Sequence, residues 1–252
     1  MPVAKGDFIL IDYTTKIKET GETFDTTSAD EAKKSNIFKE NARYEPMLVV
    51  VGESWVLKGL DDSLVGLEPE KQSTIEVPPE QAFGPRDPSK IRMIPAARFR
   101  RQDIRPYPGA EIEIEGRSAT VRAVGAGRVQ VDFNPPLAGK TLVYELVVKK
   151  TITEREEKVQ ALIHRRIPNV DLGKFKLTLG EKDVSIEVPE EATYLEGVEA
   201  AKKGLATDIQ NFLSDIEKVV FTEVFLSQKP DQVPSQQEPV QANGSEGTQS
   251  SP

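Results

Sequence analysis

The sequence predicts an α+β protein in which antiparallel strands outnumber helices, and three observations lead to that prediction. Residues 44–67 read as an apolar strand, a glycine turn and a short amphipathic helix. Residues 110–133 contain three runs in which apolar and polar residues alternate, separated by glycines, as is typical of short antiparallel strands. Residues 153–228 read as a helix, two strands, a long helix over 189–216 and a closing strand.

The composition excludes several classes of chemistry. The chain of 252 residues is long enough for one to three domains, and it contains no cysteine, which rules out disulfides and thiolate chemistry. The one histidine, His164, is expected at the surface or at an interface, so we expect no metal and no cofactor. A net charge of −8 argues against nucleic-acid binding by the whole chain. No apolar run approaches 18 residues and no leader precedes the first strand, so we expect a cytoplasmic protein without membrane contact.

The stretch at residues 44–67 is the most informative part of the sequence. A run of β-branched and leucine residues, Leu48–Val51, ends at Gly52. Apolar residues then recur at helical spacing at Leu60, Leu64 and Leu67. Three bulky apolar residues occupy the helix entrance: Trp55, Val56 and Leu57. They either form the floor of a pocket or belong to an ordinary core.

This stretch resembles the FKBP-type peptidyl-prolyl isomerases, in which a strand leads through V-G-x-x-x-V-[IL]-x-G-[WL] into the helix of the domain. The matching pairs are Val51-Gly52, Val56-Leu57 and Gly59-Leu60. Two further motifs fit, G-x-x-F-D-[ST]-[ST] at residues 21–27 and x-x-x-A-[YF]-G at residues 79–84. The resemblance implies a curved antiparallel sheet wrapped on one short helix, with a proline pocket at the entrance of that helix.

An insertion separates the last two strands of the FKBP-like region. The chain leaves this region near residue 85 and returns about fifty residues later, where Asp132, Asn134 and residues 136–140 fit the SlyD-like motif D-x-N-H-P-L-A-G-[KR]-x-L. Pro135 replaces the histidine of that motif, and the histidine-rich tail of some SlyD proteins is missing, so no nickel role is carried over. The resemblance implies a small all-β domain inserted in the flap.

Four segments follow from these motifs. We expect an FKBP-like isomerase domain from residues 1–85 plus 133–152 and an insert-in-flap chaperone domain from residues 86–132. Residues 153–228 are expected to form a C-terminal α/β domain, which resembles the extra domain of the long archaeal FKBP proteins. Residues 229–252 are rich in Pro, Gln, Ser and Gly and predict a disordered tail.

The resemblance implies catalysis of rotation about X–Pro peptide bonds, a reaction that needs no nucleophile, metal or general base. The barrier, about 18–20 kcal/mol, arises from amide resonance, and an apolar surround favours the less polar twisted amide. The implied site residues are Tyr13, Phe24, Asp25, Met47, Val56, Leu57, Leu60, Phe83 and Tyr144. By resemblance Asp25 faces the rotating carbonyl, although an Asp in such a turn is also a common capping residue. Phe83 replaces a tyrosine and therefore loses a hydroxyl that would donate a hydrogen bond to the substrate.

The insertion is basic within an acidic chain. Residues 86–131 contain ten Lys or Arg and five Asp or Glu. Apolar residues interleave with the arginines, and we predict that five of them bind unfolded chains: Ile91, Met93, Ile94, Phe99 and Tyr107. The same segment could instead be a solvated edge whose apolar residues form a core, or a contact for RNA or the ribosome.

Two classes of function remain open from the sequence. The first is a peptidyl-prolyl isomerase whose flap domain also binds unfolded or nascent proline-containing polypeptides, which makes it a folding catalyst and chaperone. The alternative is primarily a holdase chaperone or a ribosome-associated folding factor with little isomerase activity. The C-terminal domain is a candidate for mediating a homodimer.

Overall fold

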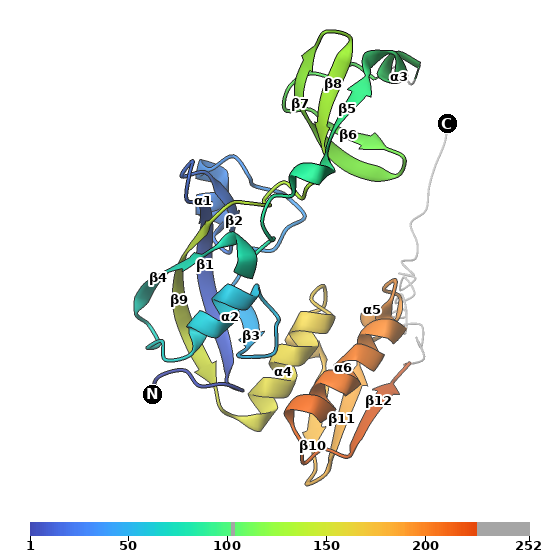
Figure 1. Cartoon of the computed structure of the whole chain (residues 1–252). Coiled ribbons are helices and arrows are strands. Elements are labelled where there is room, and N and C mark those ends of the chain that lie inside the picture. The colour runs from blue at the N-terminus through green and yellow to red at the C-terminus, as the bar shows by residue number, and fades with distance from the viewer. Residues whose placement is uncertain (102–103, 226–252) are drawn as a thin grey trace, which may run out of the picture.

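Three β-sheets organise the chain in the computed structural model, which describes residues 1–101 and 104–225 (Figure 1). The predicted tail of residues 229–252 lies outside the described residues. The first sheet has the strand order β2-β1-β9-β4, with β3 also paired to β1. Its five strands are β1 (Phe8–Ile17), β2 (Thr23–Thr26), β3 (Met47–Val50), β4 (Gln72–Val77) and β9 (Leu142–Ile152). All of its pairings are antiparallel, and the predicted hairpin at residues 6–25 is confirmed.

The long pair β1–β9 forms the centre of this sheet. The two strands run antiparallel from Phe8 opposite Ile152 to Ile17 opposite Leu142. Because successive side chains of a strand point to opposite faces, alternate residues of β1 enter two different apolar cores. Ile9 packs beneath α2, whereas Phe8 packs against the C-terminal part of the chain. The sheet is therefore covered by apolar contacts on both faces.

Helix α2 (Lys58–Leu64) lies across one face of this sheet (Figure 1). The sequence predicts a helix from residue 55, but Trp55, Val56 and Leu57 precede its first turn. The Asp61 carboxylate explains the late start, because it accepts hydrogen bonds from the backbone N–H groups of Gly52 and Ser54, each at 2.8 Å. These two bonds hold the apolar residues in a loop at the helix entrance.

Close packing of α2 on the sheet depends on a glycine. A Cβ atom at Gly59 would lie 2.6 Å from the Val77 Cγ1 atom of β4. The glycine of the family motif therefore has a packing reason, since any side chain would push the helix away from the sheet. Two further short helices belong to this region, α1 (Ala29–Lys34), which buries Ala32, and η1 (Pro79–Gln81), and η2 (Pro88–Lys90) lies at the start of the insert.

The inserted segment forms a second, four-stranded antiparallel sheet with the order β5-β8-β7-β6. Its strands are β5 (Ile91–Pro95), β6 (Glu111–Ile114), β7 (Arg117–Gly125) and β8 (Arg128–Asp132). The expectation of an all-β insert is wrong, because α3 (Ala96–Arg101) follows β5. Alanine and arginine are strong helix formers, and Phe99 anchors this helix, being only 1% exposed in the core of the insert.

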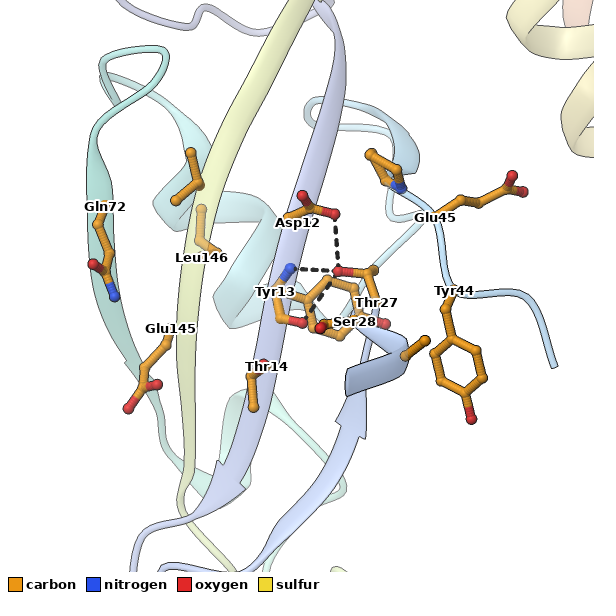
Figure 2. Close-up of a pocket in the computed structure, with 13 residues that line it drawn as sticks. Asp12, Tyr13, Thr14, Thr27, Ser28, Tyr44, Glu45, Gln72, Glu145 and Leu146 are labelled. Carbon is orange, nitrogen blue, oxygen red and sulfur yellow. Dashed lines mark hydrogen bonds between the residues drawn. The ribbon is translucent and has the colours of Figure 1, made fainter. Parts of the chain in front are cut away.

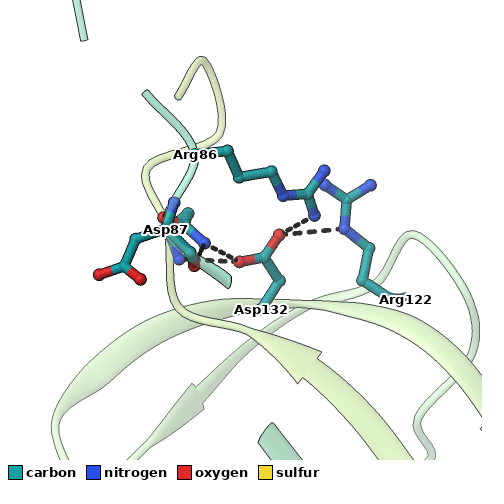
Figure 3. A network of polar contacts seen from close by, with 5 residues as sticks. Arg86, Asp87, Arg122 and Asp132 are labelled. Atoms are coloured by element: carbon teal, nitrogen blue, oxygen red, sulfur yellow. Dashed lines mark hydrogen bonds and ion pairs between the residues drawn. The ribbon is translucent and has the colours of Figure 1, made fainter. Parts of the chain in front are cut away.

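A buried carboxylate ties the two chain crossings of the insert together (Figure 3). Asp132 lies at the end of β8, and its side chain forms ion pairs with Arg86 and with Arg122. Its other oxygen accepts hydrogen bonds from the backbone N–H and the side-chain amide of Asn134 at 3.0 and 2.7 Å. Burial alone would raise the pKa of Asp132, but the Asn134 bonds and the two guanidinium groups outweigh burial and lower it to about 2.

Replacement of Asp132 by asparagine is expected to destabilise the chain at neutral pH by about 2 kcal/mol. The ordinary pKa of 3.8 falls to about 2 in the folded state, so the carboxylate contributes its full stabilisation above pH 4. This contribution disappears as the pH falls through 2. Denaturant unfolding of both proteins across this pH range checks the prediction, and a difference that persists below pH 2 would contradict it.

The third sheet belongs to the C-terminal part of the chain and has the order β10-β11-β12. Its elements are α4 (Arg155–Arg166), η3 (Leu172–Lys174), β10 (Lys176–Leu179), β11 (Asp183–Val188), α5 (Glu190–Thr193), α6 (Val198–Phe212) and β12 (Lys218–Glu223). β10 pairs antiparallel with β11, whereas β12 pairs parallel with it. The predicted single helix over 189–216 is wrong. It is broken before Gly197, which adopts the left-handed conformation (φ 79°) and caps α6.

A shared apolar core joins the C-terminal elements to the first sheet. Phe8 and Leu48 of that sheet pack in one cluster with buried residues of α4 and α6. The Phe212 ring of α6 makes edge contacts with the rings of Phe8 and Trp55, at centroid distances of 5.7 and 5.5 Å. The C-terminal elements therefore cover the face of the sheet opposite α2. No helix among the described residues is long and apolar enough to cross a membrane.

Candidate functional site

Most of the predicted site residues gather in one apolar cluster between α2 and the first sheet. They come from five separate segments of the chain, namely β1, β2, β3, the entrance and first turns of α2, and β9. The members of the cluster are Tyr13, Phe24, Met47, Val56, Leu57, Leu60 and Tyr144. Leu60 and Tyr144 are buried, at 1% and 6% exposure, and the others are half-buried.

The phenol of Tyr13 connects this cluster to Asp25. Its hydroxyl donates a hydrogen bond of 2.8 Å to the Asp25 carboxylate, and its ring lies 5.9 Å from that of Tyr144. Burial, followed by the charge of Asp25 and the bond to it, raises the pKa of Tyr13 far above its ordinary value. Burial also raises the pKa of Tyr144, to about 12. Both phenols therefore stay protonated at neutral pH, and Tyr13 holds the exposed carboxylate at the edge of the cluster.

Thr27, two residues after Asp25 in the sequence, is bonded to β1 at Asp12 and Tyr13 (Figure 2). Its hydroxyl accepts a hydrogen bond from the backbone N–H of Tyr13 at 2.9 Å and donates one to the Asp12 carboxylate at 3.1 Å. The backbone N–H of Thr27 in turn donates to the carbonyl of Tyr13 at 3.0 Å. The cavity drawn there, of about 370 Å³, is lined by three acidic residues, Asp12, Glu45 and Glu145, and differs in chemistry from the apolar cluster.

The entrance of α2 offers a hydrogen-bond donor beside the cluster. Leu57 is the N-cap residue of α2, and its carbonyl accepts from the N–H of Asp61 at 2.9 Å. Within the described ranges, none of the backbone hydrogen bonds outside regular elements uses the N–H of Leu57. The resemblance assigns that N–H to substrate binding, and this role stays a prediction.

Phe83 departs from the expected wall of the pocket. It lies outside the apolar cluster with 40% of its surface exposed, whereas its neighbour Ala82 packs against the cluster. The turn that follows places Gly84 in the left-handed conformation (φ 80°), and the backbone N–H of Gly84 donates to the carbonyl of Pro79 at 2.7 Å. This tight turn carries Phe83 to the surface, at the start of the segment that leads into the insert.

The insert divides its predicted binding residues into two groups. Ile94 and Phe99 are 8% and 1% exposed in the core of the insert, so the prediction that they contact unfolded chains is wrong for this conformation. Met93 and Tyr107 are 53% and 66% exposed, and Ile91 is half-buried. Val124 of β7 is also exposed, at 45%, and was not among the predicted residues.

Comparison with known proteins adds three family matches. Residues 1–100 match the FKBP-type peptidyl-prolyl cis-trans isomerase family, residues 92–137 match the FKBP26 IF domain and residues 155–226 match the FKBP26 C-terminal domain. The short-type peptidyl-prolyl cis-trans isomerase of Methanocaldococcus jannaschii is 32% identical over 147 residues, which cover 58% of this chain and 92% of that protein. The FKBP-type isomerase SlyD of Helicobacter pylori is 25% identical over 133 residues, 52% of this chain and 72% of that protein.

An apolar cluster at the entrance of one helix, in a sheet interrupted by an inserted domain, together with these matches defines the class. The chain belongs to the FKBP-type peptidyl-prolyl cis-trans isomerase family. Within that family it is the form that carries both an FKBP26-type insert-in-flap domain and an FKBP26-type C-terminal domain, with SlyD-like relatives.

Proposed function

We propose that proline isomerisation takes place at the opening of the cluster between α2 and the first sheet. The observation that carries the proposal is the convergence of Tyr13, Val56 and Tyr144 from distant segments beside one carboxylate. The prolyl ring packs on Leu60 and Tyr144, and the amide loses its hydration there. Because the planar amide is the more polar state, an apolar surround lowers the cost of twisting the C–N bond.

The tyrosine and the carboxylate set the polarity at the edge of this cleft. The protonated Tyr13 hydroxyl is directed to Asp25, so the carboxylate stays in place while its outer side remains open. The N–H of Leu57 holds the substrate backbone beyond the proline. Together these two groups orient the peptide, and the apolar residues act on the rotating bond.

The insert binds unfolded polypeptide through exposed apolar side chains on a basic surface. Met93 and Tyr107 project from it, and a flexible Met-containing surface tolerates varied partners. A chain held on the insert presents its prolines to the cleft at a high effective concentration. The proposed function is therefore a folding catalyst in which the insert captures clients and the cleft isomerises them.

The test uses the whole chain with two substrates. One is a short proline peptide, which is expected to reach the cleft directly. The other is an unfolded protein whose refolding is limited by proline isomerisation, a step that takes tens to hundreds of seconds without catalysis. Acceleration of both supports the proposal. Suppressed aggregation without acceleration of either substrate would instead support a holdase.

Replacement of Tyr13 by phenylalanine is expected to reduce kcat/KM on the short peptide by about threefold to tenfold. The change keeps the ring packing on Tyr144 but removes the hydrogen bond to Asp25, and such a bond contributes about 0.5–1.5 kcal/mol. Protease-free peptide assays measure the effect. The matched control is Tyr194→Phe, since Tyr194 is 74% exposed and its hydroxyl also contacts a carboxylate, that of Glu190. Equal losses in the two variants would contradict the role of the Tyr13 hydroxyl.

A further inference from the structure

A second cavity, of about 270 Å³, opens between the first sheet and α4. One side of it is formed by residues of β1, β2 and β3 and the segment before β3, and the other by α4 and the turn that follows. Three of its lining residues, Tyr13, Asp25 and Met47, also belong to the predicted prolyl site. The cavity therefore adjoins the site proposed for catalysis through these three residues.

A gap between two strands creates this cavity. β9 pairs with β1 along its whole length, so β2 and β3 share the other edge of β1. β2 pairs with residues 14–16 of β1 and β3 with residues 8–11, which leaves Asp12 and Tyr13 without a strand partner on that edge. The backbone of Tyr13 is satisfied there by Thr27. The edge of the sheet is consequently open at the point where the Tyr13–Asp25 pair lies.

One face of α4 closes the gap. The lining residues Ala161, His164, Arg165 and Pro168 follow the spacing i, i+3, i+4 and i+7, which places them on one side of the helix and of its extension. Val159, Leu162 and Ile163 point instead into the shared core. The face of α4 that looks toward the cavity adjoins the face that docks the helix, and Ala161 contacts both the cavity and the shared core.

Polar and cation–π contacts hold α4 in place beside the sheet. His164 Nε2 lies 2.8 Å from Glu45 Oε1, and the Arg43 guanidinium donates to the Asn169 side chain at 3.3 Å. The Arg165 guanidinium stacks on the Trp55 ring, 3.8 Å from its centroid. These contacts connect α4 and the turn after it to the segment before β3 and to the entrance of α2.

The chemistry of the lining selects an uncharged, apolar occupant. The wall combines Leu10, Met47, Leu48 and Ala161 with two prolines. Arg43 pairs with Glu45, which His164 also contacts, and Asp25 accepts a hydrogen bond from Tyr13. Arg165 stacks on Trp55 and has no ion pair among the described residues, so the preference for an apolar occupant rests on the apolar walls and not on a lack of charged partners. An apolar side chain would bury its surface without disturbing any of these pairs.

We propose that this cavity is a substrate subsite, and that α4 of the C-terminal domain forms its outer wall. It accepts an apolar side chain of the substrate, on a residue that flanks the proline held in the cleft. The proposal rests on the proposed function, because the shared residues make the cavity an extension of that cleft. The C-terminal domain would then contribute directly to selectivity for the residues that flank the substrate proline.

The experiment uses a series of hexapeptides that contain one proline and otherwise glycine. In each peptide one phenylalanine occupies a different position beside the proline. For the whole chain, kcat/KM is expected to rise roughly tenfold at one position, as burial of an aromatic ring would give. The variant Ala161→Leu fills the cavity, and the ratio of phenylalanine to all-glycine peptide is expected to fall to about one. The ratio does not change with the fraction of folded protein, so a partly unfolded variant does not imitate this result.

The control is Gln160→Leu, which adds the same residue one position away on α4, outside the cavity lining. It is expected to keep the ratio of the unchanged chain. A second variant, His164→Ala, widens the cavity and is expected to raise the preference for tryptophan over leucine at the same position. A preference that Ala161→Leu leaves unchanged, or the lack of preference at every position, overturns the subsite. Failure of the unchanged chain to turn over the all-glycine peptide overturns the proposed function instead.

Discussion

Substitution of Val56 by aspartate is expected to lower kcat/KM on short proline peptides by roughly 100-fold. Val56 lies in the loop before α2, half-buried in the apolar cluster beside the proposed position of the prolyl ring. An ionised carboxylate there stays hydrated and keeps water in the cleft, so the twisted amide loses the apolar surround that favours it. A loss of about 3 kcal/mol in transition-state stabilisation corresponds to this factor.

The matched control for this variant is Val65→Asp. Val65 is the C-cap residue of the same helix, is 52% exposed and lies outside the apolar cluster. The same substitution there is expected to leave peptide turnover within about twofold. Circular dichroism and thermal unfolding of both variants distinguish damage to the site in a folded protein from loss of the fold. A folded Val56→Asp variant with full activity would refute the location of the site.

Deletion of residues 87–131, with a short Gly-Ser link in their place, is expected to separate the two activities. The insert has its own core, which includes Phe99, Val121 and Val131, so its removal leaves the cluster beneath α2 intact. Turnover of short peptides is therefore expected to stay within a few-fold. Catalysis of protein refolding is expected to fall roughly 100-fold, because clients lose the high effective concentration that tethering provides.

Point variants on the insert show which surface is responsible. Met93→Glu combined with Tyr107→Glu removes the two most exposed of the large apolar groups on the insert, whereas Arg128→Glu changes the charge of an exposed position alone. The double variant is expected to reproduce most of the loss seen on deletion, and Arg128→Glu little of it. If Arg128→Glu alone causes an equal loss that salt suppresses, the insert attracts clients by charge.

Turn residues and β-branched runs were sufficient to predict strands of the central sheet, and the family resemblance predicted their arrangement in one antiparallel sheet. The hairpin around Gly21 and the strand near residues 141–152 were predicted correctly, because each is rich in β-formers and the hairpin has a clear turn signal. The insert was harder. β5 is a short apolar run that becomes a strand only by pairing with β8, and the arginine-rich run of α3 carries no regular apolar stripe. Contacts with residues distant in the sequence determine the secondary structure of both segments.

The predicted helix boundaries were wrong where a single residue overrides the helical pattern of its neighbours. Asp61 holds the entrance of α2 in a loop, and Gly197 interrupts what reads as a continuous amphipathic helix. An isolated glycine inside a helical pattern is common, so the sequence alone does not reveal the break.

The candidate site followed from motifs whose spacing survives in the chain. Seven residues of the apolar cluster and Asp25 were identified in this way. The α4 wall had no such signal, because it depends on a contact between Glu45 and His164, 119 positions apart. Burial in the insert was misjudged for a related reason. Ile94 and Phe99 belong to the same apolar-and-basic segment as Met93. The pairing of β5 with β8 decides which of Met93 and Ile94 faces water, and the packing of α3 on the insert buries Phe99.

The edge contacts of Phe212 with Phe8 and Trp55 have a mechanical consequence. Truncation after residue 152 would remove one side of the apolar interface and expose phenylalanine, leucine and tryptophan side chains of the sheet to solvent. The isomerase and its C-terminal neighbour should therefore melt together as one body. The insert has a core of its own and is joined by two chain crossings and the Asp132 ion pairs, so it is expected to unfold separately.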